Sequence, residues 1–210
     1  MDVTNFYSVP SRNISVAYPG VEQHFTPEGI RYKARYPYFL FVGALKPGKN
    51  IPKLLEAFAI FLKKSKKVYD LLLIGGDYWL DPEIDKTIKR LKLGERVKLL
   101  GFVPDCELPD YYRGAMALVV PSLVEGFCLP VVEAMACGCP VATSDIPVMR
   151  EIVGKAALFA VPYSEESLAK VLERVKSEAV QKELIALGLR QVAKFSWKLF
   201  ASKIFTLLTK

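Results

Sequence analysis

Short, almost continuously apolar runs that recur between longer amphipathic stretches constrain the fold of this chain most. The apolar runs lie at 38–43, 70–76, 97–102, 116–121, 140–144 and 156–161. Strands that are apolar on both sides must be covered on both faces, which is typical of parallel sheets in α/β proteins. Helical periodicity fills 50–65, 82–93, 107–114, 130–138, 147–153, 164–176, 178–194 and 196–208. The alternation predicts right-handed crossovers and a doubly wound parallel sheet, a Rossmann-like α/β fold.

The first residues do not follow this alternation. Residues 1–35 contain one expected strand, at 13–19, followed by a Pro-Gly turn and a polar connection. They have the pattern of the end of a preceding domain followed by a linker. We therefore expect three parts, at 1–35, 36–195 and 196–210, of which the middle one is the Rossmann-like domain and the last is a closing helix.

Composition and charge exclude several classes of function. The chain has 210 residues, of which 51% are hydrophobic and 24% charged, so it can bury a core, and no apolar run is long enough for a membrane span. The net charge of +7 suits anionic partners such as phosphates or a lipid surface. Because no arginine-rich or basic-aromatic stripe is present, we expect no nucleic-acid partner. The opening residues lack the layout of a signal peptide, which favours the cytoplasm.

The sequence does not predict a metal site. The four cysteines, Cys106, Cys128, Cys137 and Cys139, lack the spacing of a zinc site, and the chain has a single histidine, His24. We expect free thiols, as is usual in a cytoplasmic protein.

Three lysines surround the expected start of the first long helix. Gly43 ends a strand, the loop ALKPGKN follows, and Asn50 has the side chain of a helix N-cap. Lys46, Lys49 and Lys53 lie where the helix dipole disfavours cations, by about 0.3–1 kcal/mol each. An anion bound among lysines and free amides would explain them, which predicts a phosphate site. A solvated loop with water-directed lysines remains the alternative.

The segment 121–145 carries the densest set of polar candidates. Gly126 permits close backbone approach, and the amides of 126–129 and of the following helical turn have no acceptor within that helix. Pro130 is expected at the first helical position. Glu133 lies one turn into the expected helix, and its side chain points back toward the helix start, where the free amides lie. Its carboxylate suits the vicinal hydroxyls of a ribose. Glu125, on the loop, suits hydroxyls of a sugar.

Several segments together resemble one known family. EGFCLPVVEAMACGCPV is similar to the Glu-x7-Glu signature of the family 4 glycosyltransferases, which have the GT-B fold. FVGALKPGKNIPKLLEAF resembles the phosphate-binding loop of that family, and VKLLGFVPDCELPDYYRGAMALVVPS resembles its base-binding segment. NISVAYPGVEQHF and KFSWKLFASKIFTLL resemble its interdomain strand and its closing helix. The resemblance covers nearly the whole chain, in order.

The resemblance implies the donor-binding C-terminal half of a two-domain enzyme, inactive without its N-terminal acceptor domain. Such enzymes transfer a hexose from a nucleoside diphosphate sugar to a hydroxyl group, retain the anomeric configuration, and need neither a metal nor a cofactor. By the same resemblance, Glu125 is the candidate catalytic residue at the donor sugar. The implied donor-binding residues are Gly43, Lys49, Val103, Gly126, Phe127, Cys128, Leu129 and Glu133, with Lys49 at the diphosphate, Val103 at the base and Glu133 at the ribose.

Departures from the family pattern leave alternatives open. Ala44 and Gly48 stand where family members carry an arginine, and Cys128 stands where a glycine is usual, so a positive φ there would strain the loop. The stretch GCPVATSD favours the mannosyltransferase-like branch with GDP-mannose, with a UDP-sugar as the other donor. A lipid-linked acceptor would place the enzyme at the inner membrane surface. A non-catalytic nucleotide-sugar-binding module and a sugar-nucleotide epimerase remain the alternatives.

The sequence leaves the role of one aromatic pair open and favours a packing role for another. Tyr78 and Trp79 follow two glycines and either stack on a ligand or cover the edge of the domain. Tyr111 and Tyr112 are expected to serve packing.

Overall fold

A computed structural model describes residues 2–76 and 81–209, with side chains from residue 4 onward. The chain divides into two compact units. One consists of Met1–Gly20 and Lys194–Lys210, and the other of Val21–Ala193.

The larger unit is built on a parallel sheet. Its six strands are β1 (Tyr38–Val42), β2 (Asp70–Ile74), β3 (Val97–Gly101), β4 (Ala117–Val120), β5 (Val141–Ser144) and β6 (Ala157–Ala160). Within the described residues their order is β3-β2-β1-β4-β5-β6, and neighbouring strands are parallel throughout. The predicted doubly wound fold is therefore confirmed, and the six strands expected between residues 38 and 161 are each found within about two residues of their predicted bounds.

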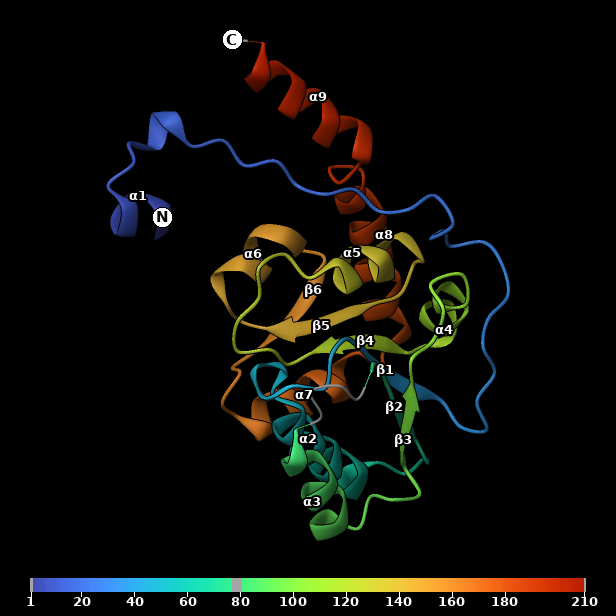
Figure 1. The fold of residues 1–210 in the computed structure, drawn as a ribbon. Helices are drawn as coiled ribbons and strands as arrows, with labels where there is room; N and C mark the ends of the chain where they lie inside the picture. Colours follow the sequence, from blue (N-terminus) through green and yellow to red (C-terminus); the bar gives the residue numbers. More distant parts are fainter. Residues whose placement is uncertain (1, 77–80, 210) are drawn as a thin grey trace. The chain divides into compact units, whose positions relative to one another are not determined.

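Helices cover both faces of this sheet (Figure 1). They are α2 (Ile51–Lys64), α3 (Pro82–Leu91), α4 (Leu108–Gly114), α5 (Leu129–Ala136), α6 (Pro147–Val153), α7 (Glu165–Arg174) and α8 (Glu178–Val192). α2 packs against α3 and α7, whereas α5 packs against α4, α6 and α8. The two groups lie on opposite faces of the sheet, as right-handed crossovers on each side of β1 require (Figure 1).

Burial of β1 on both sides explains its unbroken apolar sequence. Tyr38, Phe39, Leu40 and Phe41 are each at most 2% exposed. On one face the Phe39 ring meets the edge of the Phe61 ring from α2 at a centroid distance of 5.3 Å. The strand at the centre of the sheet is thus also the centre of the core.

Two local expectations about helix starts are wrong. Asn50 precedes α2 as predicted, but it is left-handed (φ 58°) and its side chain does not cap the helix. Its amide instead donates to the carbonyl oxygens of Pro121 (3.0 Å) and Pro162 (2.8 Å), which joins the loops after β1, β4 and β6. α5 begins at Leu129, one residue before the proline that was expected to start it.

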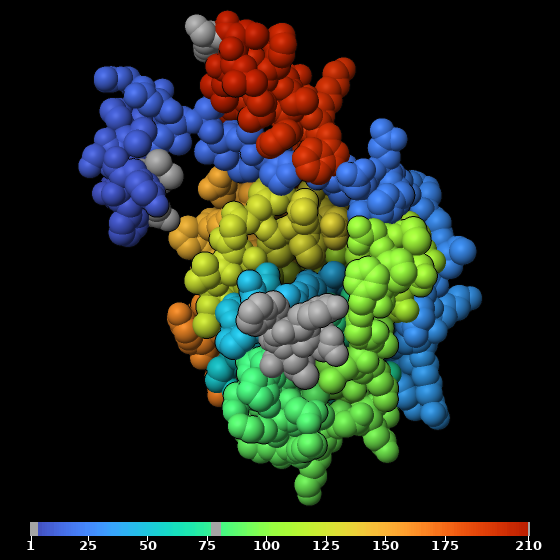
Figure 2. Space-filling view, in the orientation of Figure 1, coloured from blue at the N-terminus to red at the C-terminus, as the bar shows by residue number. Residues whose placement is uncertain are grey.

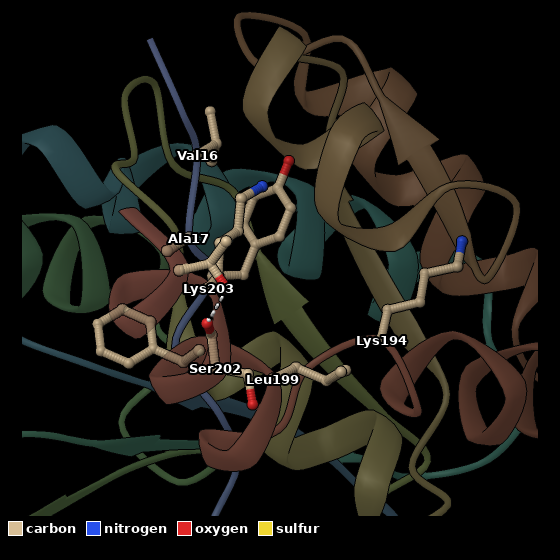
Figure 3. Close-up of a pocket in the computed structure, with 9 residues that line it drawn as sticks. Val16, Ala17, Lys194, Leu199, Ser202 and Lys203 are labelled. Carbon is tan, nitrogen blue, oxygen red and sulfur yellow. Dashed lines mark hydrogen bonds between the residues drawn. The ribbon is translucent and has the colours of Figure 1, made fainter. Parts of the chain in front are cut away.

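The smaller unit contains α1 (Asp2–Tyr7), which the sequence analysis did not anticipate, a 3-10 turn at Ser11–Asn13, and α9 (Trp197–Leu208). The strand expected at 13–19 is wrong: residues 14–19 have no strand assignment, since no described strand pairs with them. The expected cap of α9 is confirmed, because Ser196 Oγ accepts from the Leu199 amide at 3.1 Å. An open cavity of about 400 Å³ lies between Val16 and Ala17 and the side chains of α9. Figure 3 shows the residues that line it.

Gly75 provides a test of the packing at the carboxyl edge of the sheet. A Cβ there would lie 2.0 Å from the Gly43 carbonyl oxygen, which is backbone and cannot rotate away. We expect Gly75→Ala to lower the free energy of unfolding by about 1–3 kcal/mol, as overpacking does. Gly94→Ala is the control, because a Cβ at Gly94 meets nothing within 4 Å. Urea unfolding of both variants measures the difference, and equal stabilities would contradict the predicted clash.

Candidate functional site

The strand order reverses between β1 and β4. β1 pairs with β2 on one side and with β4 on the other. In open parallel sheets the connections leave such a point in opposite directions, and ligands bind in the resulting crevice at the carboxyl ends of the strands. The loop after β1 and the loop after β4 meet there, since the Leu123 amide donates to the Gly48 carbonyl oxygen at 3.0 Å. Figure 2 shows these segments, cyan and yellow-green, on the same face.

Lys49 and Glu125 form an ion pair across this reversal point. Lys49 Nζ lies 2.6 Å from Glu125 Oε1, and the two side chains are only 16% and 8% exposed. Ser122 Oγ donates to the same carboxylate oxygen at 2.6 Å. The sequence analysis predicted both charged residues for the site but not their contact. In this half-buried setting the two charges interact more strongly than a surface pair does.

The predicted cluster of three lysines is wrong for Lys53. Its ammonium group lies 2.8 Å from Glu56 and 2.9 Å from Glu165, and hydrogen bonds to these carboxylates raise the pKa of Lys53. Its side chain lies against Glu165 at the start of α7 instead of beside Glu125. Lys46 is exposed on the loop. Lys49 is therefore the lysine that the fold brings against Glu125.

The loop from Glu125 to Leu129 contains an unusual backbone conformation. Cys128 has φ 70° and ψ 70°, in the left-handed region where a residue with a Cβ costs about 1–3 kcal/mol. The sequence analysis foresaw strain here if φ were positive, and it is. Burial raises the pKa of the Cys128 thiol to about 12, and the neighbouring Glu125 carboxylate adds to this shift. The thiol is thus protonated at neutral pH and is not a nucleophile.

Gly126 and Gly43 border the same crevice. A Cβ at Gly126 would meet nothing within 4 Å, so the backbone there is open to a ligand. Gly43 has φ 144°, and a Cβ would come within 4.0 Å of Lys49 Cε. Leu129 starts α5, so the first amides of that helix lie at this end of the loop, next to Phe127.

Glu133 is held by a residue that the sequence analysis assigned to packing. The Tyr112 hydroxyl, from α4, donates to Glu133 Oε2 at 2.8 Å. Burial raises the pKa of Glu133, and the hydrogen bond from Tyr112 opposes that shift. The Tyr112 side chain is 0% exposed, and burial also raises its own pKa, so it remains a donor. Only the packing of α4 against α5 brings the two together, and no sequence pattern signalled it.

Val103 lies beyond the carboxyl end of β3. Val103 is buried, with 8% of its surface exposed, whereas the preceding Phe102 is 77% exposed. The candidates Tyr78 and Trp79 lie outside the described residues. Among the described residues, no group of three or more His, Cys, Asp or Glu side chains could hold a metal ion. In the same part of the chain, no helix has the length and apolarity needed to cross a bilayer.

Tyr112→Phe tests the support of Glu133. Without the hydroxyl, the pKa of Glu133 should rise further, and the free energy of unfolding at neutral pH should fall by about 1–3 kcal/mol. Because the lost bond serves the ionised carboxylate, the cost should shrink as the pH falls through the raised pKa. Carboxyl ¹³C NMR titration and denaturant unfolding at several pH values measure both effects.

Tyr111→Phe is the matched control for this prediction. The ring of Tyr111 stacks on Tyr32 at 4.3 Å, and its hydroxyl makes no hydrogen bond within the described part of the chain. An equal, pH-independent effect in both variants would mean that Tyr112 serves packing alone.

Comparisons with known proteins agree with this geometry. A profile of the family described as "Glycosyl transferases group 1" matches residues 23–186. The O-antigen chain mannosyltransferase B of Escherichia coli is 36% identical over 162 residues, which are 77% of this chain and 42% of that protein. The O-antigen chain mannosyltransferase RfbU of Salmonella typhimurium is 35% identical over 178 residues, 83% of this chain and 47% of that protein.

A solved structure matches in fold. The C-terminal domain of the glycosyl transferase group 1 family protein LpcC from Francisella tularensis superposes with a TM-score of 0.65 at 24% identity, covering 85% of this chain and 94% of that one. This chain spans less than half the length of the two curated relatives that it matches. The matched residues 23–186 contain every described strand of the sheet, together with Lys49, Glu125 and Glu133. The chain therefore belongs to the glycosyl transferases group 1 family.

Proposed function

We propose that this chain is the donor-binding C-terminal half of a retaining, metal-independent glycosyltransferase. It would move a hexose, namely mannose, from a nucleoside diphosphate sugar to a hydroxyl acceptor. The observation that carries the proposal is the placement of Lys49 beside Glu125 at the reversal point of the sheet, next to the start of α5. The names of the two mannosyltransferase relatives support mannose and GDP-mannose, with a UDP-sugar as the other donor.

Lys49 and the start of α5 would bind the donor diphosphate. Backbone N–H groups at a helix start have few acceptors within the helix, and the helix dipole adds partial positive charge. In α5 Pro130 has no N–H group and the Val131 N–H donates to the Cys128 carbonyl oxygen at 3.1 Å, so the N–H groups of Cys128 and Leu129 would make the contacts. An ammonium group beside them completes an anion site. When the glycosidic bond breaks, negative charge develops on the departing diphosphate, and these fixed donors would stabilise it. No metal is then required for that step.

Glu133 would bind the ribose hydroxyls of the donor. Its carboxylate accepts from Tyr112 through one oxygen, which leaves lone pairs of the other oxygen available for hydroxyl donors. The backbone of Val103, beyond β3, would meet the base. Acceptor-only groups suit the ribose and would repel the diphosphate, so Glu133 also sets the direction in which the donor lies.

Glu125 would act at the donor sugar, and entry of the donor would change its partner. In the structure its Oε1 atom is bound by both Lys49 and Ser122. A diphosphate would draw Lys49 away, because phosphate carries more charge than a single carboxylate. Glu125, still held by Ser122, would then accept from sugar hydroxyls. The ion pair thus couples diphosphate binding to the availability of the residue that contacts the sugar.

The acceptor would be bound by a preceding N-terminal domain facing this one. The share of the relatives that this chain spans supports such an arrangement, as does the likeness to a C-terminal domain. We place the assembled enzyme in the cytoplasm, with a lipid-linked acceptor at the inner membrane surface. Transfer activity should therefore require the N-terminal domain, whereas donor binding is a property of this chain.

Calorimetric titration with GDP-mannose, without metal, tests the donor site. We expect saturable binding that weakens about 10- to 100-fold in Lys49→Gln and in Glu133→Gln, because each variant removes a charge-assisted hydrogen bond. Lys53→Gln is the matched control, since Lys53 is occupied by Glu56 and Glu165 and should leave the affinity unchanged. Parallel titrations with UDP and GDP identify the base. Failure of the folded chain to bind any of them would contradict the proposal.

Glu125→Gln separates the two roles of the ion pair. The neutral amide keeps an oxygen for Ser122 but no longer holds Lys49, so GDP should bind as tightly as before or more tightly. GDP-mannose should no longer bind more tightly than GDP, because the carboxylate that accepts from the sugar hydroxyls is gone. Transfer by the protein with its N-terminal domain restored should fall by orders of magnitude. Loss of GDP affinity in this variant would show that Glu125 positions Lys49 instead of competing for it.

A further inference from the structure

Two basic segments meet at the amino edge of the sheet, opposite the donor site. Residues 31–37 lead into β1, and residues 63–69 lead into β2, its neighbour (Figure 1). The Asp70 amide donates to the Pro37 carbonyl oxygen at 3.0 Å, so the segments end side by side. Parallel strands start at one edge and end at the other, which separates this region from the crevice by the length of the strands.

These segments hold the excess charge of the chain. Residues 31–37 and 63–69 contain no acidic residue, and their basic residues are Arg31, Lys33, Arg35, Lys63, Lys64, Lys66 and Lys67. The formal net charge of the whole chain is +7, so the remaining residues balance one another. By themselves, the lysines of 63–67 lie at the end of α2, where cations suit the helix dipole. The fold adds the cations of 31–35 to them.

A pocket opens within this basic region. Its volume is about 340 Å³, and its lining includes four cationic side chains, Arg31, Lys67, Arg113 and Lys176, but no Asp or Glu. The amide-bearing Gln181 also lines it. Lining residues come from the linker before β1, the loop before β2, α4 and the start of α8, so the pocket depends on the tertiary fold.

Two of the four cations are committed within the protein. The Arg113 side chain is 7% exposed, donates to the carbonyl oxygens of Ile30 (2.7 Å) and Thr26 (3.0 Å), and pairs with Asp110. Lys176 pairs with Glu173 at 2.6 Å. These contacts fix the wall of the pocket.

The other two cations, Arg31 and Lys67, are the candidates for direct contact with an anion. Arg31 donates one hydrogen bond, to the Arg113 carbonyl oxygen at 3.1 Å, which orients its guanidinium group beside the pocket. Within residues 4–76 and 81–209, neither Arg31 nor Lys67 has a carboxylate at ion-pair distance. Arginine offers a planar fork of donors and lysine a mobile point charge, and both suit phosphate oxygens.

We propose that this pocket binds a phosphate group, as a second anion site distinct from the donor site. Arg31 and Lys67 make the direct contacts, Arg113 and Lys176 set the local potential, and the surrounding lysines attract anions from a distance. Two sources offer this chemistry, namely free phosphate and the headgroups of an anionic lipid surface. The inference does not depend on the proposed transfer reaction.

The first arm of the test uses inorganic phosphate at constant ionic strength. All proteins carry Lys49→Gln, so that phosphate does not report the donor site. We expect saturable shifts of the backbone amide NMR signals of Lys67 and Gly114, and at least about a tenfold loss of affinity in the Arg31→Gln/Lys67→Gln variant. Lys86→Gln/Lys89→Gln removes the same charge from α3, where both lysines are exposed and paired on their own helix, and should bind as the parent does.

The second arm measures sedimentation with phosphatidylglycerol vesicles against phosphatidylcholine vesicles. A lipid source predicts binding to the anionic vesicles only, competition by inorganic phosphate, and a fall of about fivefold in partitioning for each cation removed at the pocket. A free-phosphate source predicts the phosphate arm alone. The proposal is overturned if neither probe binds, or if the α3 control loses as much affinity as the pocket variant. Unchanged urea unfolding shows that each variant is folded.

Discussion

The parallel pairing of β1 with both β2 and β4 is the constraint on which the rest of the larger unit depends. It places β1 inside the sheet and buries Tyr38, Phe39, Leu40 and Phe41 on its two faces. It also sends the connections after β1 and β4 to opposite faces of the sheet, and the loops that begin them meet at the carboxyl edge. The same pairing that builds the core therefore brings Lys49 and Glu125 together.

The positive charges at the two edges of the sheet differ in whether carboxylates neutralise them. At the carboxyl edge, Lys49 is neutralised by Glu125, and Lys53 by Glu56 and Glu165. A site balanced in this manner binds an anion by exchanging partners, which makes its affinity depend on what the released carboxylate then contacts. At the amino edge Arg31 and Lys67 have no such partner among the described residues, and an anion there would meet an unopposed field.

Two residues in the loops at the carboxyl edge of the sheet, Cys128 and Asn50, have a left-handed backbone conformation. Cys128 holds a left-handed conformation directly before α5, where a glycine would be unstrained. The cost is offset by the packing of α5 against its neighbours, including the Tyr112 hydroxyl that holds Glu133. Asn50, also left-handed, serves a related purpose, because its amide connects the loops after β4 and β6 to the start of α2. Backbone strain thus lies beside the crevice and is stabilised by long-range hydrogen bonds.

The sequence by itself determined the sheet and its helical covering, because burial periodicity and the alternation of strands with helices are written in local patterns. Only the tertiary structure decided which charges meet. Lys53 pairs with Glu165 at the start of α7, and the Tyr112 hydroxyl donates to Glu133. Arg31 and Lys67, from segments distant in the chain, line one pocket. Residues 14–19 form no strand, since a strand exists only where a neighbouring strand supplies its hydrogen bonds. Such contacts depend on side-chain direction and on partners distant in the chain, which local patterns do not encode.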